Sequence, residues 1–104
     1  MKHISLGGKK YPLVHLEWVD IVGDSTTVGA EDFNDLVCAH IVTIGYLYGS
    51  FRRKGKEYIR TFASYEPGEK PAFGDRNVYP LSVFTSASKK TIRKALTFQK
   101  EGTS

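Results

Sequence analysis

Cationic and aromatic side chains crowd together in residues 40–65, and that combination suits a surface that binds phosphate and stacks on nucleobases. Guanidinium groups bind phosphate through paired hydrogen bonds, and each ring that stacks on a base contributes about 1–3 kcal/mol. The residues that could supply this chemistry are Arg52, Arg53, Lys54, Lys56, Tyr58, Arg60 and Phe62. They predict a surface that binds an anionic ligand such as a nucleotide or a nucleic acid.

A β-hairpin is the element that must position these side chains. Residues 38–51 are apolar at almost every position and rich in β-branched types, which favours a long buried strand over a helix. The basic turn follows, with Gly55 placed to adopt positive φ, and residues 57–65 form the return strand. The period of two then gives one face of the return strand to Lys56, Tyr58, Arg60 and Phe62.

The same residues also have a purely structural interpretation. Tyr58 and Phe62 could be core residues or cover an oligomer contact, while the basic turn keeps the hairpin tip soluble. In a second alternative the tyrosines of the hairpin anchor a protein partner, since tyrosine supplies rigid amphipathic contact area. Those possible interface residues are Tyr46, Tyr48 and Tyr65.

Other kinds of site are not indicated. The histidines His3, His15 and His40 are scattered and have no zinc-ligand spacing with Cys38, so neither a metal nor a cofactor is expected. Cys38 could share a strand face with His40, but a third catalytic member and an oxyanion motif are lacking. Cys38 is therefore expected in the core, Asp20 beside a turn, and the protein is not expected to be an enzyme.

Composition and charge narrow the class of protein. The 104 residues, 40% hydrophobic and 25% charged, suit one domain with a modest core. We expect no membrane span, no secretory signal and, with one cysteine, a reducing cytoplasm. Residues 1–48 carry three basic and six acidic side chains, whereas residues 49–104 carry twelve and five. This asymmetry indicates an anion-attracting face, two halves that pair with each other, or only a solvated surface.

The remaining elements are expected around the hairpin. Residues 1–12 are expected to be a flexible N-terminal arm, and residues 13–22 a strand followed by a turn. A short helix over residues 30–37 would turn Phe33, Leu36 and Val37 inward. The glycine within the long strand, Gly45, suggests a bend or bulge.

The C-terminal part changes character. Residues 77–85 predict a strand that Pro80 restricts to a sheet edge or a bend. Ser88 could cap a basic helix, so residues 88–104 are expected to be a tail or helix beside a β domain of residues 13–87. The predicted fold is mainly β: a small, strongly bent antiparallel sheet or an SH3/Sm-like barrel, with a short helical insert and a possible C-terminal helix.

The stretches WVDIVGDS, IVTIGYLY and VYPLSVF carry a family resemblance. In their order they resemble a group of small uncharacterised proteins of tailed bacteriophages and prophages. The matching positions are Trp18, Asp20, Thr43, Ile44, Gly45, Tyr46, Leu47, Tyr79, Pro80 and Val83. The resemblance implies a phage-encoded protein with a small β fold that acts in the host cytoplasm. The basic turn of this chain departs from that group, in which the corresponding segment is usually acidic.

Together these features predict a non-enzymatic phage accessory protein that binds an anionic ligand. A small β fold has little room for a pocket inside one chain, so a homo-oligomer with a site between subunits is expected. In one version of this function, the protein sequesters a nucleotide signal of host defence. The alternative is a protein-protein inhibitor or structural component that docks a host or virion protein.

Overall fold

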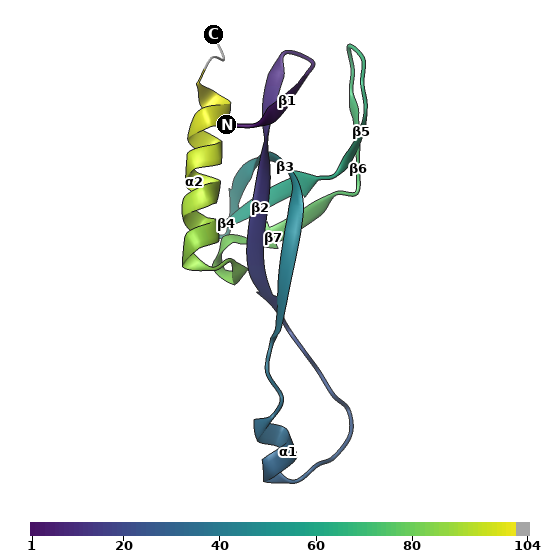
Figure 1. The fold of residues 1–104 in the computed structure, drawn as a ribbon, viewed down its shortest axis with the longest axis vertical. Coiled ribbons are helices and arrows are strands. Elements are labelled where there is room, and N and C mark those ends of the chain that lie inside the picture. Colours follow the sequence, from purple (N-terminus) through teal and green to yellow (C-terminus); the bar gives the residue numbers. More distant parts are fainter. Residues whose placement is uncertain (102–104) are drawn as a thin grey trace.

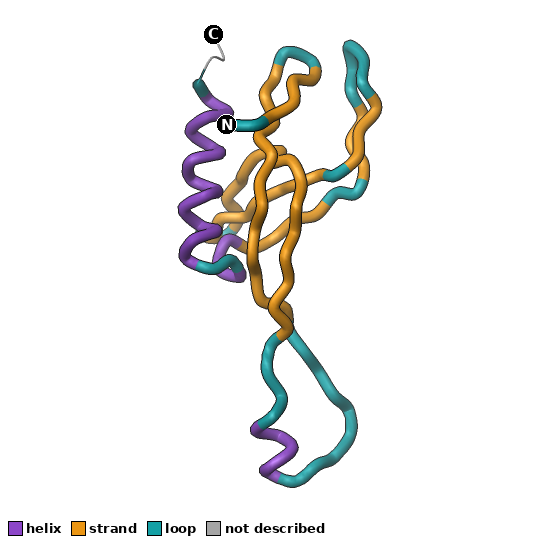
Figure 2. Tube along the Cα trace, in the orientation of Figure 1, coloured by secondary structure: helices purple, strands orange, loops and turns teal. Residues whose placement is uncertain are grey.

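A five-stranded antiparallel sheet with one long helix against it forms the body of the protein (Figures 1 and 2). The computed structural model describes residues 1–101. Its sheet has the strand order β1-β2-β3-β4-β7, and β5 and β6 pair in a separate ribbon. The elements are β1 (His3–Leu6), β2 (Lys9–Asp20), α1 (Ala30–Asn34), β3 (Ala39–Arg53), β4 (Lys56–Phe62), β5 (Ser64–Glu66), β6 (Ala72–Gly74), β7 (Asn77–Pro80), the 3₁₀ turn η1 (Leu81–Val83) and α2 (Ser86–Lys100).

The main core lies between α2 and one face of the sheet, which we call the inner face. Ile92 and Ala95 of α2 are fully buried and belong to one cluster with residues of the sheet. The sheet contributes Val14, Leu16, Leu47, Ile59 and Tyr79 to that cluster. These five residues alternate with exposed neighbours because successive strand side chains point to opposite faces. The opposite face of the sheet is the outer face.

Polar contacts hold both ends of α2 on the sheet. Thr85 caps the helix by accepting a hydrogen bond from the Ser88 N–H at 3.3 Å. The buried Ser88 hydroxyl accepts a hydrogen bond from the Glu17 N–H at 2.7 Å, which ties the first turn of α2 to β2. Near the other end, Gln99 Nε2 donates to the carbonyl oxygens of Lys10 and Tyr48 at 3.2 and 2.9 Å. The orientation of α2 is thus set by apolar packing and by bonds at its two ends.

A second, aromatic cluster lies on the outer face at the end of the sheet where β1 and the β5–β6 ribbon meet. Phe62 is 1% exposed and its ring centroid lies 5.3 Å from that of Tyr11 and 4.8 Å from that of Phe73. Edge-to-face pairs of this kind add to the apolar burial. The ring of Tyr46 stacks on Phe62 from the neighbouring strand.

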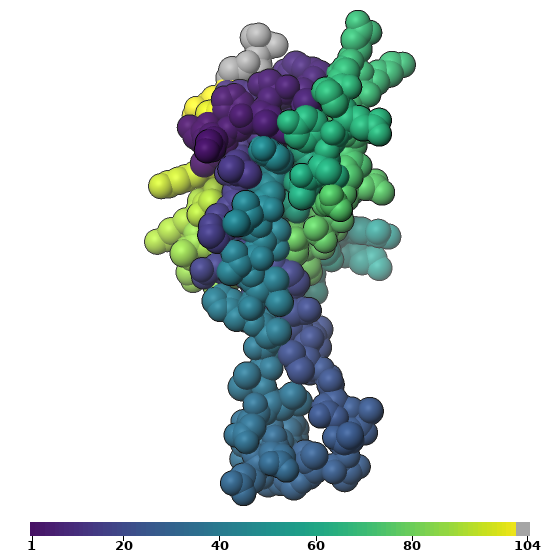
Figure 3. Space-filling view, turned by 45° about the vertical axis from the view of Figure 1, so that its right-hand side comes forward, coloured from purple at the N-terminus to yellow at the C-terminus, as the bar shows by residue number. Residues whose placement is uncertain are grey.

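Residues 19–44 form a long projection that we call the arm. The ends of β2 and β3 leave the body as a two-stranded ribbon, and the loop between them carries α1 (Figure 1). The space-filling view shows this projection standing clear of the body (Figure 3). The molecule accordingly measures 59 × 28 × 26 Å along its principal axes.

The predicted fold class is confirmed, in the form of an open bent sheet with β1 and β7 at its edges. Pro80 lies on an edge strand as expected, the place in a sheet where proline is tolerated. Residues 1–12 were predicted to be a flexible N-terminal segment, but they form β1 and the start of β2. Gly7 and Gly8 both adopt positive φ and turn β1 back onto β2. Of the predicted C-terminal tail or helix over residues 88–104, the part up to Lys100 belongs to α2, which Thr85 rather than Ser88 caps, and residues 102–104 lie outside the described part of the chain.

Burial around the arm was predicted wrongly. Phe33, Leu36 and Val37 were expected to face inward, but they are 67%, 42% and 73% exposed. Helical spacing identifies an apolar stripe without showing that anything packs against it. Cys38 is exposed rather than in the core. Residues 38–51 are not buried throughout either, since their exposure alternates along the first half of β3.

The bulge in β3 lies beside the predicted position. Gly45 stays in the ladder opposite Val14, and the register shifts between Leu47 and Gly49 instead. A Cβ on Gly45 would lie only 3.0 Å from the Phe62 carbonyl oxygen, so close approach explains the glycine there.

Replacing Ile92 by alanine should test the docking of α2. The side chain is fully buried against the inner face, so Ile92→Ala should lower the free energy of unfolding by about 2–5 kcal/mol. Lys94→Ala in the same helix is the control and should change it by less than about 0.5 kcal/mol, because Lys94 is exposed. Urea denaturation measures both. Equal effects of the two substitutions would contradict the docking of α2.

Candidate anion-binding face

The basic turn joins β3 to β4 as a tight two-residue hairpin. Lys54 and Gly55 adopt φ values of 52° and 77°, the signature of a type I′ turn. Register then pairs Arg53 with Lys56 directly across the strands, on the outer face. Two like charges in such a cross-strand pair repel each other, and a bound anion would relieve that repulsion.

An aromatic and cationic stack follows along the same face. The rings of Phe51 and Tyr58 lie parallel with centroids 5.1 Å apart, as expected for cross-strand partners. The guanidinium carbon of Arg60 lies 4.0 Å from the centroid of the Phe51 ring. This cation–π contact orients the Arg60 side chain while leaving the residue exposed.

Arg60 also lines a cleft of about 830 Å³ where the β5–β6 ribbon leaves the sheet. Arg76, in the link between β6 and β7, lines the same cleft, and Tyr48 and Phe73 contribute aromatic rings to it. The bulge in β3 exposes Tyr48, and Gln99 of α2 holds the Tyr48 carbonyl from behind the sheet. Two arginines from separate elements therefore meet beside aromatic side chains in a space of the size that small ligands occupy.

The charge of this surface is not balanced locally. Within residues 1–101, Arg53, Lys56 and Arg76 form no ion pair, and Asp75 is the one carboxylate that lines the cleft. A planar guanidinium binds carboxylate or phosphate through two parallel hydrogen bonds. The outer face of β4 and the adjoining cleft thus form a cationic strip that presents both arginines and rings.

On the inner side, Glu57 anchors the hairpin to α2. Both carboxylate oxygens of Glu57 accept hydrogen bonds from Arg93 at 2.9 Å, and Arg52 lies 3.6 Å away. These hydrogen bonds from Arg93 hold the pKa of Glu57 below its usual value. Arg52 also donates to the Gly55 carbonyl at 3.1 Å, so it is engaged within its own turn.

The structure brings most of the predicted binding residues onto one surface. Lys56, Tyr58 and Arg60 share the outer face with Arg53, as the alternation predicted. Arg52 lies on the other face beside Glu57, and Lys54 stands at the turn itself. Phe62 has the same parity as Arg60 and lines the cleft, but its side chain is only 1% exposed because the aromatic cluster surrounds its ring.

The possible interface tyrosines gather around that cluster. Tyr48 and Tyr65 are 43% and 39% exposed, whereas Tyr46 is half-buried against the ring of Phe62. Burial raises the pKa of the neighbouring Tyr11, whose ring stacks on Tyr48 at 5.9 Å. The three tyrosines thus form the partly exposed rim of a core cluster.

Sequence reasoning missed Arg76 and Phe73 as members of the cleft. Arg60 pairs with Val78 in the ladder, and only this register brings the residues just before β7 close to β4. The cluster of Gly74, Asp75, Arg76 and Asn77 was recognisable as a turn. Its place beside Arg60 follows from strand pairing that local patterns do not specify.

The described residues do not form the other kinds of site considered from the sequence. His40 lies 3.6 Å from Glu17 across the outer face, and no group of three or more His, Cys, Asp or Glu side chains in residues 1–101 could hold a metal ion. No helix in that range combines the length and apolar character needed to cross a membrane.

Comparisons with known proteins do not add to this geometry. A scan against protein-family models, a search of curated proteins and a search of solved structures each give no significant match to the chain.

Replacing Glu57 by glutamine should test how the hairpin is anchored. The folded-state pKa of Glu57 is lowered, so its carboxylate contributes to the free energy of unfolding. That contribution is complete above about pH 4.5 and is lost as the pH falls through the folded-state pKa. Glu57→Gln should therefore cost about 1 kcal/mol at pH 7 and little once the wild-type carboxyl is protonated. Urea denaturation over a series from pH 7 down into the acid range measures this difference, and a cost that stays constant over the whole series would contradict it.

Proposed function

We propose that this chain is a non-enzymatic binding protein whose outer face takes up an anionic, ring-bearing ligand of the nucleotide type. The observation that carries the proposal is the meeting of Arg60 and Arg76 in one cleft beside Tyr48 and Phe73. Arginines would hold the phosphates, and the exposed aromatic edges would contact the base.

The hairpin extends this surface beyond the cleft. Arg60 is shared between the cleft and the stack of Phe51 and Tyr58, and Arg53 and Lys56 continue the positive charge to the turn. A mononucleotide or dinucleotide fits the dimensions of the cleft, while the strip along β4 could guide further phosphates of a single strand. The size of the cleft makes the small nucleotide the better-supported ligand.

The resemblance to phage proteins supplies a biological setting for this proposal. Among its matching positions, Tyr79 belongs to the inner core and Trp18 packs against that core. The indole N–H of Trp18 donates a hydrogen bond to the Thr43 hydroxyl at 2.9 Å. The resembling residues would thus maintain the fold, and the outer-face cations would belong to this chain's own function. Sequestration of a nucleotide signal in a host cell is the version of the function that this setting favours.

Titration calorimetry with ATP, a cyclic dinucleotide and short single- and double-stranded DNA should reveal binding at low ionic strength. Removing one charged hydrogen-bonding group costs about 1.5–3 kcal/mol, so Arg60→Ala or Arg76→Ala should weaken the affinity about 10- to 100-fold. The matched control is Lys94→Ala, an exposed cation of α2 on the other side of the sheet, which should leave the affinity unchanged.

Two results would contradict the proposal. One is the absence of binding to every one of these ligands, which would favour the alternative that the chain docks a protein. The other is an equal loss of affinity in the Arg60 and Lys94 variants, which would indicate general attraction to positive charge. Binding that falls steeply with salt and prefers the oligonucleotides would identify nucleic acid as the ligand.

A further inference from the structure

The arm exposes an unusual amount of apolar surface. Of the thirteen exposed large hydrophobic residues in the described chain, nine lie in the arm. They are Val19, Ile21, Val22, Val28, Phe33, Leu36, Val37, Val42 and Ile44. No residue of α1 is buried. Contiguous apolar surface on this scale is rare on monomers and marks a contact with another molecule.

Part of this apolar surface lies on the outer face of the β2–β3 ladder, where the arm joins the body. Ile44 and Val42 are 61% and 51% exposed and lie opposite His15 and Glu17 in the β2–β3 ladder. Val19, opposite His40, extends the same face toward the loop. Val19, Val42 and Ile44 therefore lie on one side of the ribbon, and the other six exposed residues lie in the segment between its two strands.

The charge of the arm is opposite to that of the rest of the chain. Residues 11–51 contain six acidic side chains and no lysine or arginine, whereas the rest of the chain has fifteen basic and five acidic residues. The acidic residues of the arm are Asp20, Asp24, Glu31, Asp32 and Asp35. Hydrogen bonds from the hydroxyl and the N–H of Thr26 lower the pKa of Asp24.

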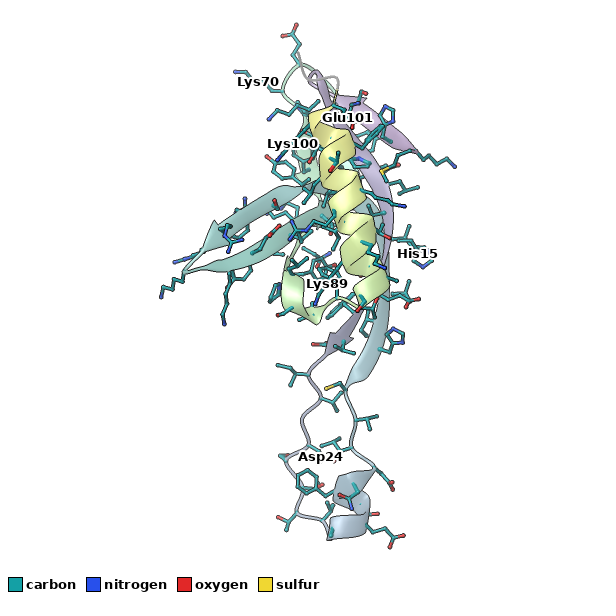
Figure 4. The ribbon with its side chains drawn as sticks, turned by 90° about the vertical axis from the view of Figure 1, so that its left-hand side faces the viewer. His15, Asp24, Lys70, Lys89, Lys100 and Glu101 are labelled. Carbon is teal, nitrogen blue, oxygen red and sulfur yellow. The ribbon has the colours of Figure 1, made fainter. Side chains whose placement is uncertain are left out.

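One molecule cannot bring these opposite charges together. The arm extends away from the body, and Figure 4 shows Asp24 and Lys70 at opposite ends of the long axis. Two arms laid side by side would place acidic residues against acidic residues. An arm laid on the basic outer face of another copy would instead bury apolar side chains between complementary charges.

We propose that a second copy of this chain is the partner of the arm, with the acidic, apolar arm of each copy on the basic outer face of the other. A twofold axis makes both contacts equivalent and closes the assembly as a dimer. In this arrangement Asp32 and Asp35 of one copy approach Arg60 and Arg76 of the other. The proposal needs only the arm and the positive charge of the outer face and does not require a nucleotide ligand, but the partner's arm and such a ligand would compete for Arg60 and Arg76.

A charge-swap experiment on the full chain tests this dimer. One variant carries Asp32→Lys and Asp35→Lys in the arm, and the other carries Arg60→Glu and Arg76→Glu on the outer face. All four residues are exposed, so both variants should fold, as circular dichroism can verify. Sedimentation velocity then compares the wild type, each variant alone and their equimolar mixture.

The wild type should sediment as a dimer, and each variant alone should dimerise about tenfold more weakly or not at all. The mixture should restore the dimer, because one contact joins the positive arm of the first variant to the negative face of the second, and the other contact keeps the wild-type charges on both sides. As a control, Lys89→Glu with Lys94→Glu on α2 should leave dimerisation unchanged.

Two outcomes would overturn the proposal. If the wild type stays monomeric up to concentrations of about 100 µM, the arm does not recognise its own chain and its apolar strip serves a different protein. If the outer-face variant dimerises as well as the wild type, the contact is between arms and not between arm and face.

Discussion

The packing of α2 on the inner face is the interaction on which the rest of the structure depends. Ile92 and Ala95 complete the core with Leu16, Leu47 and Ile59, while Ser88 and Gln99 fix the helix to the backbone of the sheet at both ends. One helix can cover only one side of a sheet. The other side therefore stays open except where the β5–β6 ribbon and β1 meet over Phe62.

The open face of the sheet has three regions of different chemistry. An aromatic cluster around Phe62 closes one end, a cationic strip with Arg60 follows β4, and an apolar strip with Val42 and Ile44 runs along β3 into the arm. The body alone needs neither strip for its stability, since its core is complete on the inner face. Both strips are better explained by contacts with other molecules: an anionic ligand or the acidic arm of a second chain on the cationic strip, and a second chain on the apolar strip.

Strand alternation was the most reliable signal in the sequence. It placed Lys56, Tyr58 and Arg60 on one face because β4 is a regular strand with one covered side. The same rule misjudged Phe62, because the covering ribbon makes the outer face buried at that one end. Parity assigns a residue to a face, but burial depends on what lies over that face.

The arm shows the limit of periodicity more clearly. Phe33 and Leu36 have the spacing of an inward helical stripe, yet they are 67% and 42% exposed and no residue of α1 is buried. Arg76 could not be assigned to the site because its position depends on the pairing of β4 with β7, which are joined by a long ribbon. Contacts that depend on distant pairing, or on a second molecule, leave no local pattern in the sequence.

The central claim is that the outer face of the sheet is the working surface of the protein. The most direct measurement is the change in amide chemical shifts of ¹⁵N-labelled protein when ATP is added. The account predicts shifts in β4, in β7 and in residues 73–76, with α2 unaffected because it lies on the other side of the sheet. Shifts concentrated in α2, or none at all, would contradict it.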